Sequence, residues 1–461
     1  MSELDLQGVK KIHLVGVGGC GMSGLAKVLK EMDFEVSGSD VKEGRNTLRL
    51  RDLGVKVFIG HNEAQVRGAD LVVFSSAISA DNPELREAEA QGLRLVKRAE
   101  VLAWIMNQSK NRVAVGGTHG KTTTTAMIAK VLDVAQLKPT FLIGCDMDYV
   151  EGNARLGDGK YVVAEADESD RSFLFLSPTA EVITNIEPDH LEHFGSFEEL
   201  VKTFQEFLER LPSGGLVIAW GEDKNLQKLL TQPRFKVVTY GFDSTLDFSA
   251  CEFNFSEYTS SYTLLYQGKK EGKVELAIPG RQNILNSLAV FALGFEWGLE
   301  FSAIAAGLRS FVGARRRFSL VGDYRGVLIV DDYAHHPTEI IETLKAARLG
   351  WPGRRIICIF QPHRYSRTML LKDSFARAFD EADRIIITDI YAASEPPLPG
   401  ISGKTIADLL DQKKTTYFPR KEHIAEKLAP ELKEGDFVLT LGAGDIYTVG
   451  KELLARLRMQ E

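Results

Sequence analysis

Short apolar runs alternate with amphipathic segments over the first hundred residues of the chain. The apolar runs have the length of strands and cover residues 11–17, 34–38, 55–59, 71–74 and 93–96. Helix-like segments between them cover residues 22–30, 47–53 and 83–91. Strands that alternate with helices are typical of a parallel, doubly wound sheet. This region is therefore predicted to form an α/β domain.

The same alternation returns after a polar stretch at residues 107–111. Strand-like runs cover residues 113–115, 161–164, 182–184 and 216–219, and helix-like segments cover 123–132 and 197–210. From residue 248 to 278 polar and apolar positions alternate, with glycines at turns, which predicts a β-hairpin or meander. A helix is expected from about residue 284 to 297.

A third α/β alternation follows the basic cluster at residues 315–317. Its expected elements cover residues 327–330, 337–348, 355–360, 373–379, 384–388 and 437–441. A chain of 461 residues exceeds a single hydrophobic core, and about 150 residues per domain predicts three domains. We place them at residues 1–108, 109–313 and 314–461.

Composition narrows the class of protein and its partners. Hydrophobic residues make up 44% and charged residues 26% of the chain, as in ordinary soluble proteins. The net charge of −7 gives no reason to expect nucleic acid as a partner, since its binders usually carry a basic face. The four cysteines include no CxxC pair, so we expect reduced thiols. The acidic start lacks a signal peptide and no apolar run reaches ~18 residues, so no membrane contact and a cytoplasmic location are expected.

The most informative motif is the GGTHGKT stretch at residues 116–122, between an expected strand and an expected helix. Backbone N–H groups of such a loop converge on phosphate oxygens, and a helix N-terminus favours negative charge. Lys121 would neutralise the outer phosphates, and the Thr122 hydroxyl would hold Mg²⁺. Val115 stands where the common GxxxxGK[ST] pattern has its first glycine, so this loop is one residue shorter. The motif predicts ATP binding.

A GxGxxG turn at residues 16–21 follows the first expected strand, and Asp40 follows the second. Glycines of such a turn allow close approach of a pyrophosphate, and the acid contacts a ribose. Any pyrophosphate would fit, including that of a UDP-sugar. A tight turn without a ligand is the alternative.

Acidic residues gather at residues 165–170 (EADESD), directly after an expected strand. Four acids in six residues suit a hard cation such as Mg²⁺ beside nucleotide phosphates, and solvated charge is the alternative. Asp189 and His190 follow the next strand, on the side where ligands bind in open α/β sheets. Alone, a histidine in that place is more often a hydrogen-bonded structural residue.

Two strand-end loops of the third block carry histidine and arginine. Residues 331–337 read DDYAHHP and residues 361–367 read QPHRYSR. Arginine forms bidentate pairs with carboxylates, so these loops suit carboxylate recognition. Zinc is a weaker alternative, because neither loop has the spacing of a structural zinc site. A glycine turn at residues 441–445 is interpreted as a turn and helix cap.

Two asparagines stand at the start of the helix expected near residue 284. Asn283 would cap the helix, and Asn286 lies three positions on along the same face. Capping explains one asparagine but not both.

Together these motifs resemble the Mur ligases of bacterial cell-wall synthesis over nearly the whole chain. The most specific parts are residues 13–24, the loop at 117–122, the acids at 165–170 and the two third-domain loops. The resemblance implies three α/β domains: a Rossmann-like N-terminal domain for the UDP-substrate, a central P-loop ATPase-type domain with a β insertion, and a Rossmann-like C-terminal domain. The last would bring the amino acid and close over ATP.

The resemblance also implies roles for individual residues. Lys121, Glu165, His190 and Arg317 would be catalytic, and Thr122, Glu165 and His190 would hold Mg²⁺. ATP would be bound by Gly117, Thr118, His119, Gly120, Lys121, Thr122, Thr123, Asn283, Asn286, Arg317 and Asp332. The UDP-substrate would be bound by Gly16, Gly18, Gly19, Cys20, Gly21, Met22, Ser23, Ser39, Asp40, Ser75 and Ser76. The amino acid and the substrate carboxylate would meet Tyr333, His335, His363, Arg364 and Arg367.

Within the family, the chain is most similar to the branch that adds L-alanine to UDP-N-acetylmuramate in peptidoglycan precursor synthesis. The lactyl carboxylate would attack the γ-phosphate of ATP, and the alanine amine would then attack the acyl phosphate. Domain closure would exclude water from this intermediate. Many relatives carry a carbamylated lysine, but a gap-free reading places Gln205 there and Lys202 three positions away, so that modification is not predicted.

Three alternatives remain open from the sequence. A recycling ligase of the same family would attach a tripeptide to the same UDP-sugar. A nicotinamide-dependent dehydrogenase would use Gly16, Gly18 and Asp40. It would leave Lys121, Glu165 and His190 unexplained. A UDP-sugar sensor would keep the nucleotide sites without catalysis. A monomer or weak homodimer is expected.

Overall fold

The computed structural model describes residues 4–147, 152–231 and 234–459, so the first three residues of the acidic start lie outside it. The chain forms two compact units. The first comprises Met1–Ser249, Leu265–Lys270 and Asn286–Leu308, and the second comprises Ala250–Leu264, Glu271–Leu285 and Arg309–Glu461. None of the described helices is both long enough and apolar enough to cross a membrane.

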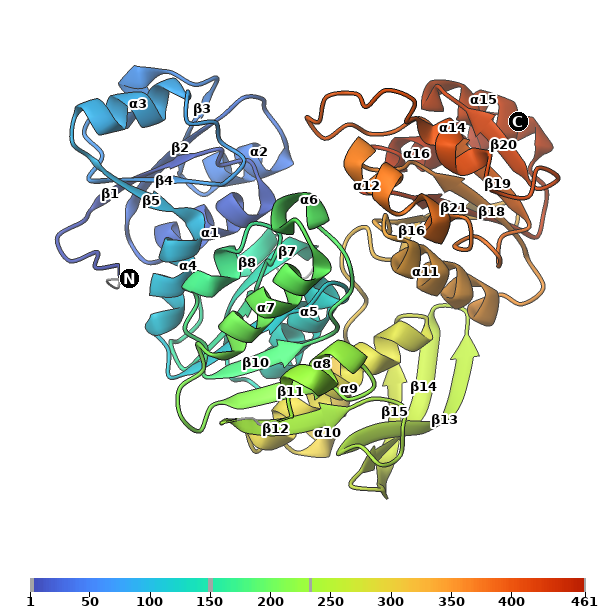
Figure 1. Cartoon of the computed structure of the whole chain (residues 1–461), viewed down its shortest axis with the longest axis horizontal. Helices are drawn as coiled ribbons and strands as arrows, with labels where there is room; N and C mark the ends of the chain where they lie inside the picture. The colour runs from blue at the N-terminus through green and yellow to red at the C-terminus, as the bar shows by residue number, and fades with distance from the viewer. Residues whose placement is uncertain (1–3, 148–151, 232–233, 460–461) are drawn as a thin grey trace. The chain divides into compact units, whose positions relative to one another are not determined.

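The first unit begins with a five-stranded parallel sheet of order β3-β2-β1-β4-β5 (Figure 1). Its strands are β1 (Lys11–Val15), β2 (Glu35–Asp40), β3 (Lys56–Ile59), β4 (Leu71–Phe74) and β5 (Arg94–Lys97). The helices are α1 (Cys20–Glu31), α2 (Arg45–Asp52), η1 (Glu63–Val66), α3 (Pro83–Ala90) and α4 (Arg98–Asn107). The predicted α/β alternation is confirmed, although α4 is not predicted by the pattern.

The central sheet has ten strands in the order β15-β14-β13-β12-β11-β10-β6-β9-β7-β8. Their bounds are β6 (Asn111–Gly116), β7 (Thr140–Met147), β8 (Gly152–Arg155), β9 (Tyr161–Glu165), β10 (Ala180–Ile183), β11 (Leu216–Trp220), β12 (Lys236–Tyr240), β13 (Phe248–Ser256), β14 (Thr259–Tyr266) and β15 (Lys269–Leu276). The helices are α5 (Lys121–Val134), η3 (Ser172–Phe175), α6 (Leu191–Phe194), α7 (Phe197–Leu208), α8 (Lys224–Leu229), α9 (Arg281–Glu296) and α10 (Phe301–Arg309). Consecutive strands β13 to β15 confirm the predicted meander.

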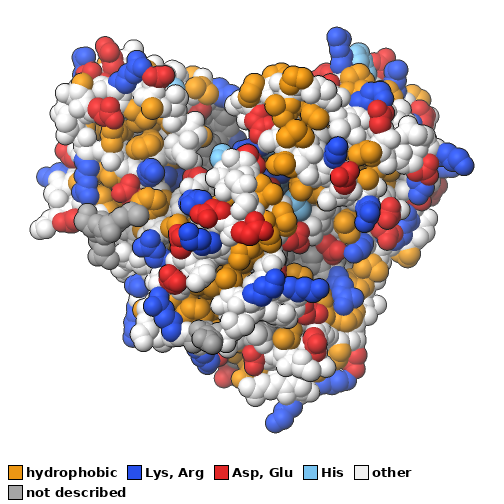
Figure 2. Space-filling view, in the orientation of Figure 1, with side chains coloured by type: hydrophobic (Ala, Val, Ile, Leu, Met, Phe, Trp, Pro, Cys, Tyr) orange, Lys and Arg blue, Asp and Glu red, His pale blue; other side chains and the backbone are white. Residues whose placement is uncertain are grey.

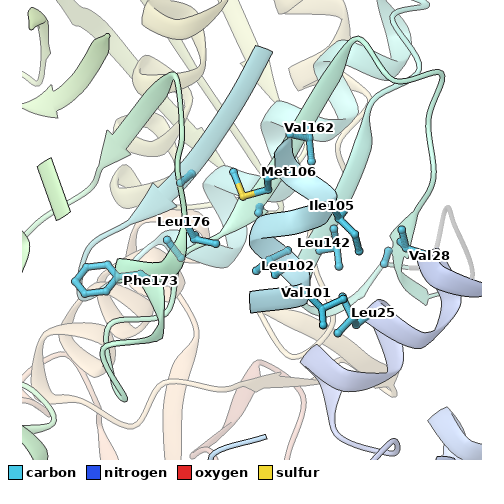
Figure 3. Close-up of a cluster of buried hydrophobic side chains, with 14 of the residues drawn as sticks. Leu25, Val28, Val101, Leu102, Ile105, Met106, Leu142, Val162, Phe173 and Leu176 are labelled. Atoms are coloured by element: carbon cyan, nitrogen blue, oxygen red, sulfur yellow. The ribbon is translucent and has the colours of Figure 1, made fainter. Parts of the chain in front are cut away.

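One hydrophobic core joins the helices of the first sheet to the central sheet. Side chains of α1 and α4 pack with side chains of β7 and β9, as Figure 3 shows for Leu25, Val28, Val101, Leu102, Ile105, Leu142 and Val162. Helix α4 buries Ala99, Val101, Leu102, Ile105 and Met106. A helix buried on several sides has no clear apolar stripe, which explains why the sequence pattern misses it.

The second unit contains a six-stranded sheet of order β16-β17-β21-β18-β19-β20, parallel except for the edge strand β16. The strands are β16 (Ser319–Tyr324), β17 (Val327–Asp332), β18 (Arg355–Phe360), β19 (Arg384–Thr388), β20 (Thr415–Phe418) and β21 (Asp436–Leu441). The helices are α11 (Pro337–Gly350), α12 (Tyr365–Leu370), α13 (Lys372–Phe375), α14 (Gly403–Ala407), η4 (Lys421–His423), α15 (Ile424–Leu428), η5 (Ala429–Glu431) and α16 (Tyr447–Met459). Apolar cores cover both faces of this sheet.

Two local predictions are wrong. The helix expected at residues 373–379 is the single turn α13, which ends at Phe375. Helix α9 begins at Arg281, so Asn283 lies inside it and is not its N-cap. Its backbone N–H donates to Gly280 O at 3.2 Å, and its side-chain Nδ2 donates to Pro279 O at 2.7 Å. The helix starts earlier because Gly280 supplies the left-handed residue, with φ of +99°, that turns the chain into it.

Charged side chains of both signs are interspersed on the visible face of the molecule (Figure 2). The chain has 56 basic and 63 acidic residues, so such mixing is expected. A charged ligand must therefore be bound by a local cluster of charged side chains, and not by a whole face of one sign.

Glu181 is an acidic residue inside the core of the first unit. It lies on β10 opposite Ala114 of β6 and Val217 of β11, both of which belong to the core. Directly opposed residues of parallel strands point to the same face, so Glu181 points into the core as well. The side chain has no exposed surface, and neither carboxyl oxygen has a hydrogen-bond partner among the described residues. Burial raises the pKa of this carboxyl well above its ordinary value.

We expect Glu181→Met to stabilise the first unit, and more so at alkaline pH. The unfolded chain loses this proton near pH ~4.3 while the folded chain keeps it, so the wild type loses stability as pH rises above that value. The gain in free energy of unfolding should be about 2 to 4 kcal/mol near pH ~8 and much smaller near pH ~4. Urea unfolding at both pH values measures it, with the exposed Glu209→Met as control. An equal gain at both pH values would contradict a buried, protonated Glu181.

Candidate active site

The glycine turn after β1 is fixed by polar contacts to the end of β2. The N–H of Gly16 donates to Ser39 O at 2.8 Å, and the N–H of Gly18 donates to Asp40 Oδ2 at 2.8 Å. A Cβ on Gly18 would lie 2.8 Å from the same Asp40 oxygen. Asn46 completes the set by donating to Gly18 O at 2.9 Å. Asp40 therefore orders the turn, in addition to any contact with a ribose.

Ser39 points into the domain instead of toward the turn. It is fully buried and donates to Glu84 Oε2 at 2.8 Å, an oxygen that also lies 2.6 Å from His13 Nε2. His61 Nδ1 lies 2.6 Å from the other oxygen. Burial by itself would raise the pKa of Glu84, but these hydrogen bonds bring it below its ordinary value. The Ser39 side chain is therefore part of a buried carboxylate network beneath the predicted substrate site.

Two charged side chains, those of Arg98 and Asp170, lie next to residues that are predicted to bind the UDP-substrate. A Cβ on Gly21 would lie 2.8 Å from a guanidinium nitrogen of Arg98, so this cation lies against the glycine turn. Ser76 donates to Asp170 at 2.6 Å. The sequence interpretation missed Arg98. Its only signal was a pair of basic residues, Lys97 and Arg98, that follows the expected strand at 93–96.

The phosphate loop after β6 is held by the chain that follows β10. Thr118 N–H donates to Asn185 O and His119 N–H donates to Asn185 Oδ1, both at 2.9 Å. Glu187 N–H donates to Thr118 Oγ1 at 2.9 Å. Gly117 has φ of +122°, and a Cβ there would lie 2.1 Å from Thr184 Oγ1. Asn185 thus shapes the loop, a role that the sequence motif did not reveal.

Lys121 lies at the start of α5 with its ammonium surrounded by oxygens. Nζ lies 2.8 Å from Glu168 Oε2 and donates to Gly117 O at 2.6 Å and Thr118 O at 3.0 Å. Burial by itself lowers the pKa of Lys121, but the carboxylates of Glu168 and Asp167 raise it above its ordinary value. The ammonium therefore stays charged at neutral pH. It lies within the glycine loop, whose backbone is of the kind that binds phosphate.

Glu165 and Thr122 lie next to each other beside this ammonium. Thr122 Oγ1 donates to Glu165 Oε1 at 2.9 Å, and Gly144 N–H donates to Glu165 Oε2 at 2.6 Å. Burial by itself would raise the pKa of Asp167, but Lys121, then Ser169 and His190, bring it below its ordinary value. Carboxylate and hydroxyl oxygens are the ligands that Mg²⁺ prefers, so this donor set fits the predicted ion.

Asn286 is brought to the phosphate loop by helix α9. A Cβ on Gly120 would lie 2.8 Å from Asn286 Oδ1. Gly120 also has φ of +84°, a conformation that favours glycine. The structure therefore brings one of the two predicted asparagines to the loop.

Asp332 and Arg317 lie in the second unit, near the end of β17. Both Asp332 oxygens accept backbone N–H groups, from Phe318 and Ala334, at 2.7 Å. Burial raises the pKa of Asp332 to about 6, against the opposing charge of Arg317. Arg317 lies 3.6 Å from Glu339 and over the ring of Tyr333. Asp332 therefore fixes the loop that carries the predicted amino-acid residues.

The histidines and arginines of the two third-domain loops come together in the second unit. The rings of His335 and His363 lie 5.8 Å apart, and Arg367 Nη1 lies 3.2 Å from His363 Nδ1. Arg364 caps α12 with φ of +68° and ψ of +141°, a backbone conformation that a non-glycine residue rarely adopts. Glu339, which the sequence interpretation did not include, lies 3.1 Å from His335.

Comparison with known protein families gives three consecutive matches. They are the Mur ligase family, catalytic domain, at residues 11–110, the Mur ligase middle domain at 115–294, and the Mur ligase, glutamate ligase domain, at 316–444. The chain belongs to the Mur ligase family. The family resemblance expected from the motifs is thereby confirmed, as is the α/β class of its domains.

Individual Mur ligases are similar to this chain over nearly its full length. UDP-N-acetylmuramate–L-alanine ligase of Trichlorobacter lovleyi is 44% identical over 97% of this chain and 99% of its own length. The ligase of the same name from Desulforamulus reducens is 46% identical over 98% and 99%. Among solved structures, UDP-N-acetylmuramate-alanine ligase of Thermotoga maritima has a TM-score of 0.83 at 31% identity, covering 98% of this chain and all of that one. A murein peptide ligase of Psychrobacter arcticus has a TM-score of 0.71 at 25% identity, covering 97% and 98%.

We expect Gly120→Ala to weaken nucleotide binding, because the added Cβ meets Asn286 at the phosphate loop. Gly159 has almost the same backbone, with φ of +88°, but a Cβ added there would have no described atom within 4 Å. Gly159→Ala is therefore a matched control with the same backbone cost of about 1 kcal/mol. Calorimetric titration with ATP should show at least about tenfold weaker binding for Gly120→Ala alone, which corresponds to ~1.4 kcal/mol. Equal affinities in the two variants would contradict this placement of the nucleotide.

Proposed function

We propose that this chain joins L-alanine to the lactyl carboxylate of UDP-N-acetylmuramate, with ATP converted to ADP and phosphate. The observation that carries the proposal is the full-length similarity to Mur ligases named for this reaction, at 42 to 46% identity. The half-buried lysine of the phosphate loop, Lys121, supports an ATP-dependent step. The product would be a peptidoglycan precursor, which links the chain to cell-wall growth, cell shape and division.

Lys121 would stabilise the phosphoryl group as it moves from ATP to the substrate carboxylate. Its pKa is raised, so it carries the positive charge that the transferring oxygens need. Its contacts to Gly117 O and Thr118 O hold the ammonium within the loop. Glycines at 117 and 120 leave room for phosphate oxygens next to backbone N–H groups. Transfer would leave an acyl phosphate on the substrate and release ADP.

Thr122, Glu165 and His190 would hold Mg²⁺, which neutralises phosphate charge when it is bound. Glu165 is already positioned for this by the N–H of Gly144, which donates to its second oxygen. Asp167, whose pKa is lowered, keeps additional negative charge near the cation positions, whereas burial raises the pKa of Glu168 to about 7. Asn283 and Asn286 would contact the adenosine part of ATP, and Arg317 and Asp332 the nucleotide.

Arg364 and Arg367 would bind carboxylates in the second unit. Arg367 is 5% exposed and lies against His363, so its guanidinium is held in place before a substrate arrives. Tyr333, His335 and His363 would surround the incoming amino acid. The amine would attack the acyl carbon, and phosphate would leave as the amide bond forms. The glycine turn after β1, with Ser75 and Ser76, would hold the UDP part of the other substrate.

Three further expectations stay predictions. The domain limits at residues 108 and 313 divide the chain into parts for the UDP-substrate, for ATP, and for the amino acid. A cytoplasmic location and a monomer or weak homodimer are also proposed. The tripeptide-adding ligase is the second candidate function, because a murein peptide ligase also shares the fold.

The proposal predicts phosphate release that depends on alanine. Purified protein with ATP, Mg²⁺ and UDP-N-acetylmuramate should release phosphate when alanine is added, and less with glycine or serine. The tripeptide L-alanyl-γ-D-glutamyl-meso-diaminopimelate tests the second candidate. Faster release with the tripeptide than with alanine would overturn the proposed function in favour of the recycling reaction.

Lys121→Ala should abolish this release, because no other described group supplies an ammonium inside the loop. A loss of at least about 10³-fold in kcat is expected, comparable to the removal of a main electrostatic group in other enzymes. Lys130→Ala, nine positions along the same helix, is the matched control and should keep activity. Circular dichroism checks that both variants are folded. Turnover close to that of the wild type in folded Lys121→Ala would refute the role of this lysine.

A further inference from the structure

Four aromatic rings form a continuous row across the strand ends of the second unit. Tyr333 and His335 follow β17, with ring centroids 5.3 Å apart, and His335 lies 5.8 Å from His363, which follows β18. His363 in turn stacks on Tyr391, which follows β19, at 5.7 Å and an interplanar angle of 8°. Three of these rings come from the loops predicted to meet the amino acid. Tyr391 is the fourth, and no motif indicated it.

Tyr391 is held firmly by the loop that follows β18. Its N–H donates to Pro362 O at 2.8 Å, and its carbonyl accepts from Arg364 N–H at 2.9 Å. The backbone thus forms a short bridge between His363 and Tyr391 beyond the ends of their strands. The Tyr391 residue keeps 38% of its surface exposed. A ring whose backbone is fixed on both sides and whose surface is partly exposed can contact a bound ligand without moving.

The same segment also holds the helix that carries Arg367. Glu395 Oε1 accepts from Ser366 Oγ at 2.6 Å, and Glu395 Oε2 accepts from Ser366 N–H at 3.1 Å, at the start of α12. Ala393 and Ser394 have φ of +48° and +70°, so the chain turns sharply between Tyr391 and Glu395. One turn therefore connects the fourth ring to the arginine that lies beside the third.

A glycine in the turn after β21 leaves space for the Tyr391 ring. A Cβ on Gly444 would lie 2.6 Å from Tyr391 Cγ and 2.5 Å from Gln361 Oε1. Gly444 does not have a positive φ, so its backbone would accept alanine. The requirement for glycine here is steric and comes from both Gln361 and Tyr391.

We propose that Tyr391 determines the size of amino acid that this ligase accepts, as the outer wall of the amino-acid site that begins at Tyr333. The inference rests on the proposed function. Arg367 would take the carboxylate of the amino acid, and the row of rings would enclose its side chain. An apolar side chain as small as the methyl group of alanine gains contact from such a wall, and a longer one meets the Tyr391 ring. Tyr391 is therefore a specificity-determining residue and takes no part in proton or phosphoryl transfer.

The test compares alanine with L-2-aminobutyrate, which is one methylene longer. Tyr391→Ala should lower the ratio of kcat/KM for alanine to that for L-2-aminobutyrate by at least about tenfold, since a wall that excludes one methylene is worth about 10-fold or more. Tyr391→Phe keeps the ring and should keep the ratio. KM values for ATP and UDP-N-acetylmuramate should stay within about twofold in both variants, which a general loss of structure would not allow.

Gly444→Ala provides an independent variant, because it displaces the ring without removing it. It should lower kcat/KM for alanine, and adding Tyr391→Ala should relieve the part of that effect that comes from the ring and leave the part that comes from Gln361 Oε1. An unchanged ratio in Tyr391→Ala, with alanine-dependent phosphate release intact, would overturn the inference and leave the proposed function standing. No phosphate release by the wild type with any amino acid would overturn both.

Discussion

Parallel strands place all their carboxyl ends along one edge of a sheet, and most of the candidate chemistry of this chain depends on that constraint. The glycine turn follows β1, the phosphate loop follows β6, and the acids follow β9. In the second unit, Asp332 ends β17 and the His363 loop follows β18. Residues that are far apart in sequence are brought together because their strands are neighbours, as β6 lies between β9 and β10. Ligand sites at this edge are a general property of open α/β sheets.

Electrostatics divides the central site into positive and negative parts. The side chain of Lys121 is only 13% exposed, and burial by itself would lower its pKa. Glu168 and Asp167 keep it charged, and the raised pKa of Lys121 records their effect. Asp167, whose own pKa is lowered, places negative charge near Glu165 and Thr122, where a divalent cation would bind. A phosphate group could thus meet a lysine on one side and a metal ion on another, without either charge being free in solvent.

Buried and half-buried polar groups also set the shape of the loops. Asn185 holds the phosphate loop through the backbone of Thr118 and His119. Asp332 does the same for its own loop by accepting two backbone N–H groups. Arg316 donates to Gly442 O and Gly444 O, which fixes the glycine turn after β21 beneath Tyr391. These groups take up backbone hydrogen bonds that would otherwise be unsatisfied, and so they make the loops rigid enough to position reactive side chains.

Much of the fold was predictable from the sequence, because strands in parallel sheets are continuous apolar runs bounded by glycines and polar residues. The runs at 71–74, 355–360 and 384–388 correspond to β4, β18 and β19 to the residue. Helix α4 was missed because it is buried on several sides. The range predicted for α13 was too long, because the apolar residues that follow Phe375 pack in the core without being part of that helix. The α9 start was misplaced since Gly280, not Asn283, turns the chain.

The sequence by itself determined the phosphate loop, the acidic cluster and the third-domain loops, since the functional groups of each come from consecutive residues. Tertiary structure alone decided which distant residues support them. Arg98 lies against the first glycine turn, and Glu84 accepts a hydrogen bond from the Ser39 hydroxyl. Tyr391 is the last ring of the row that begins at Tyr333. No local spacing encodes these contacts, because each depends on strand order and on side-chain packing between segments tens of residues apart.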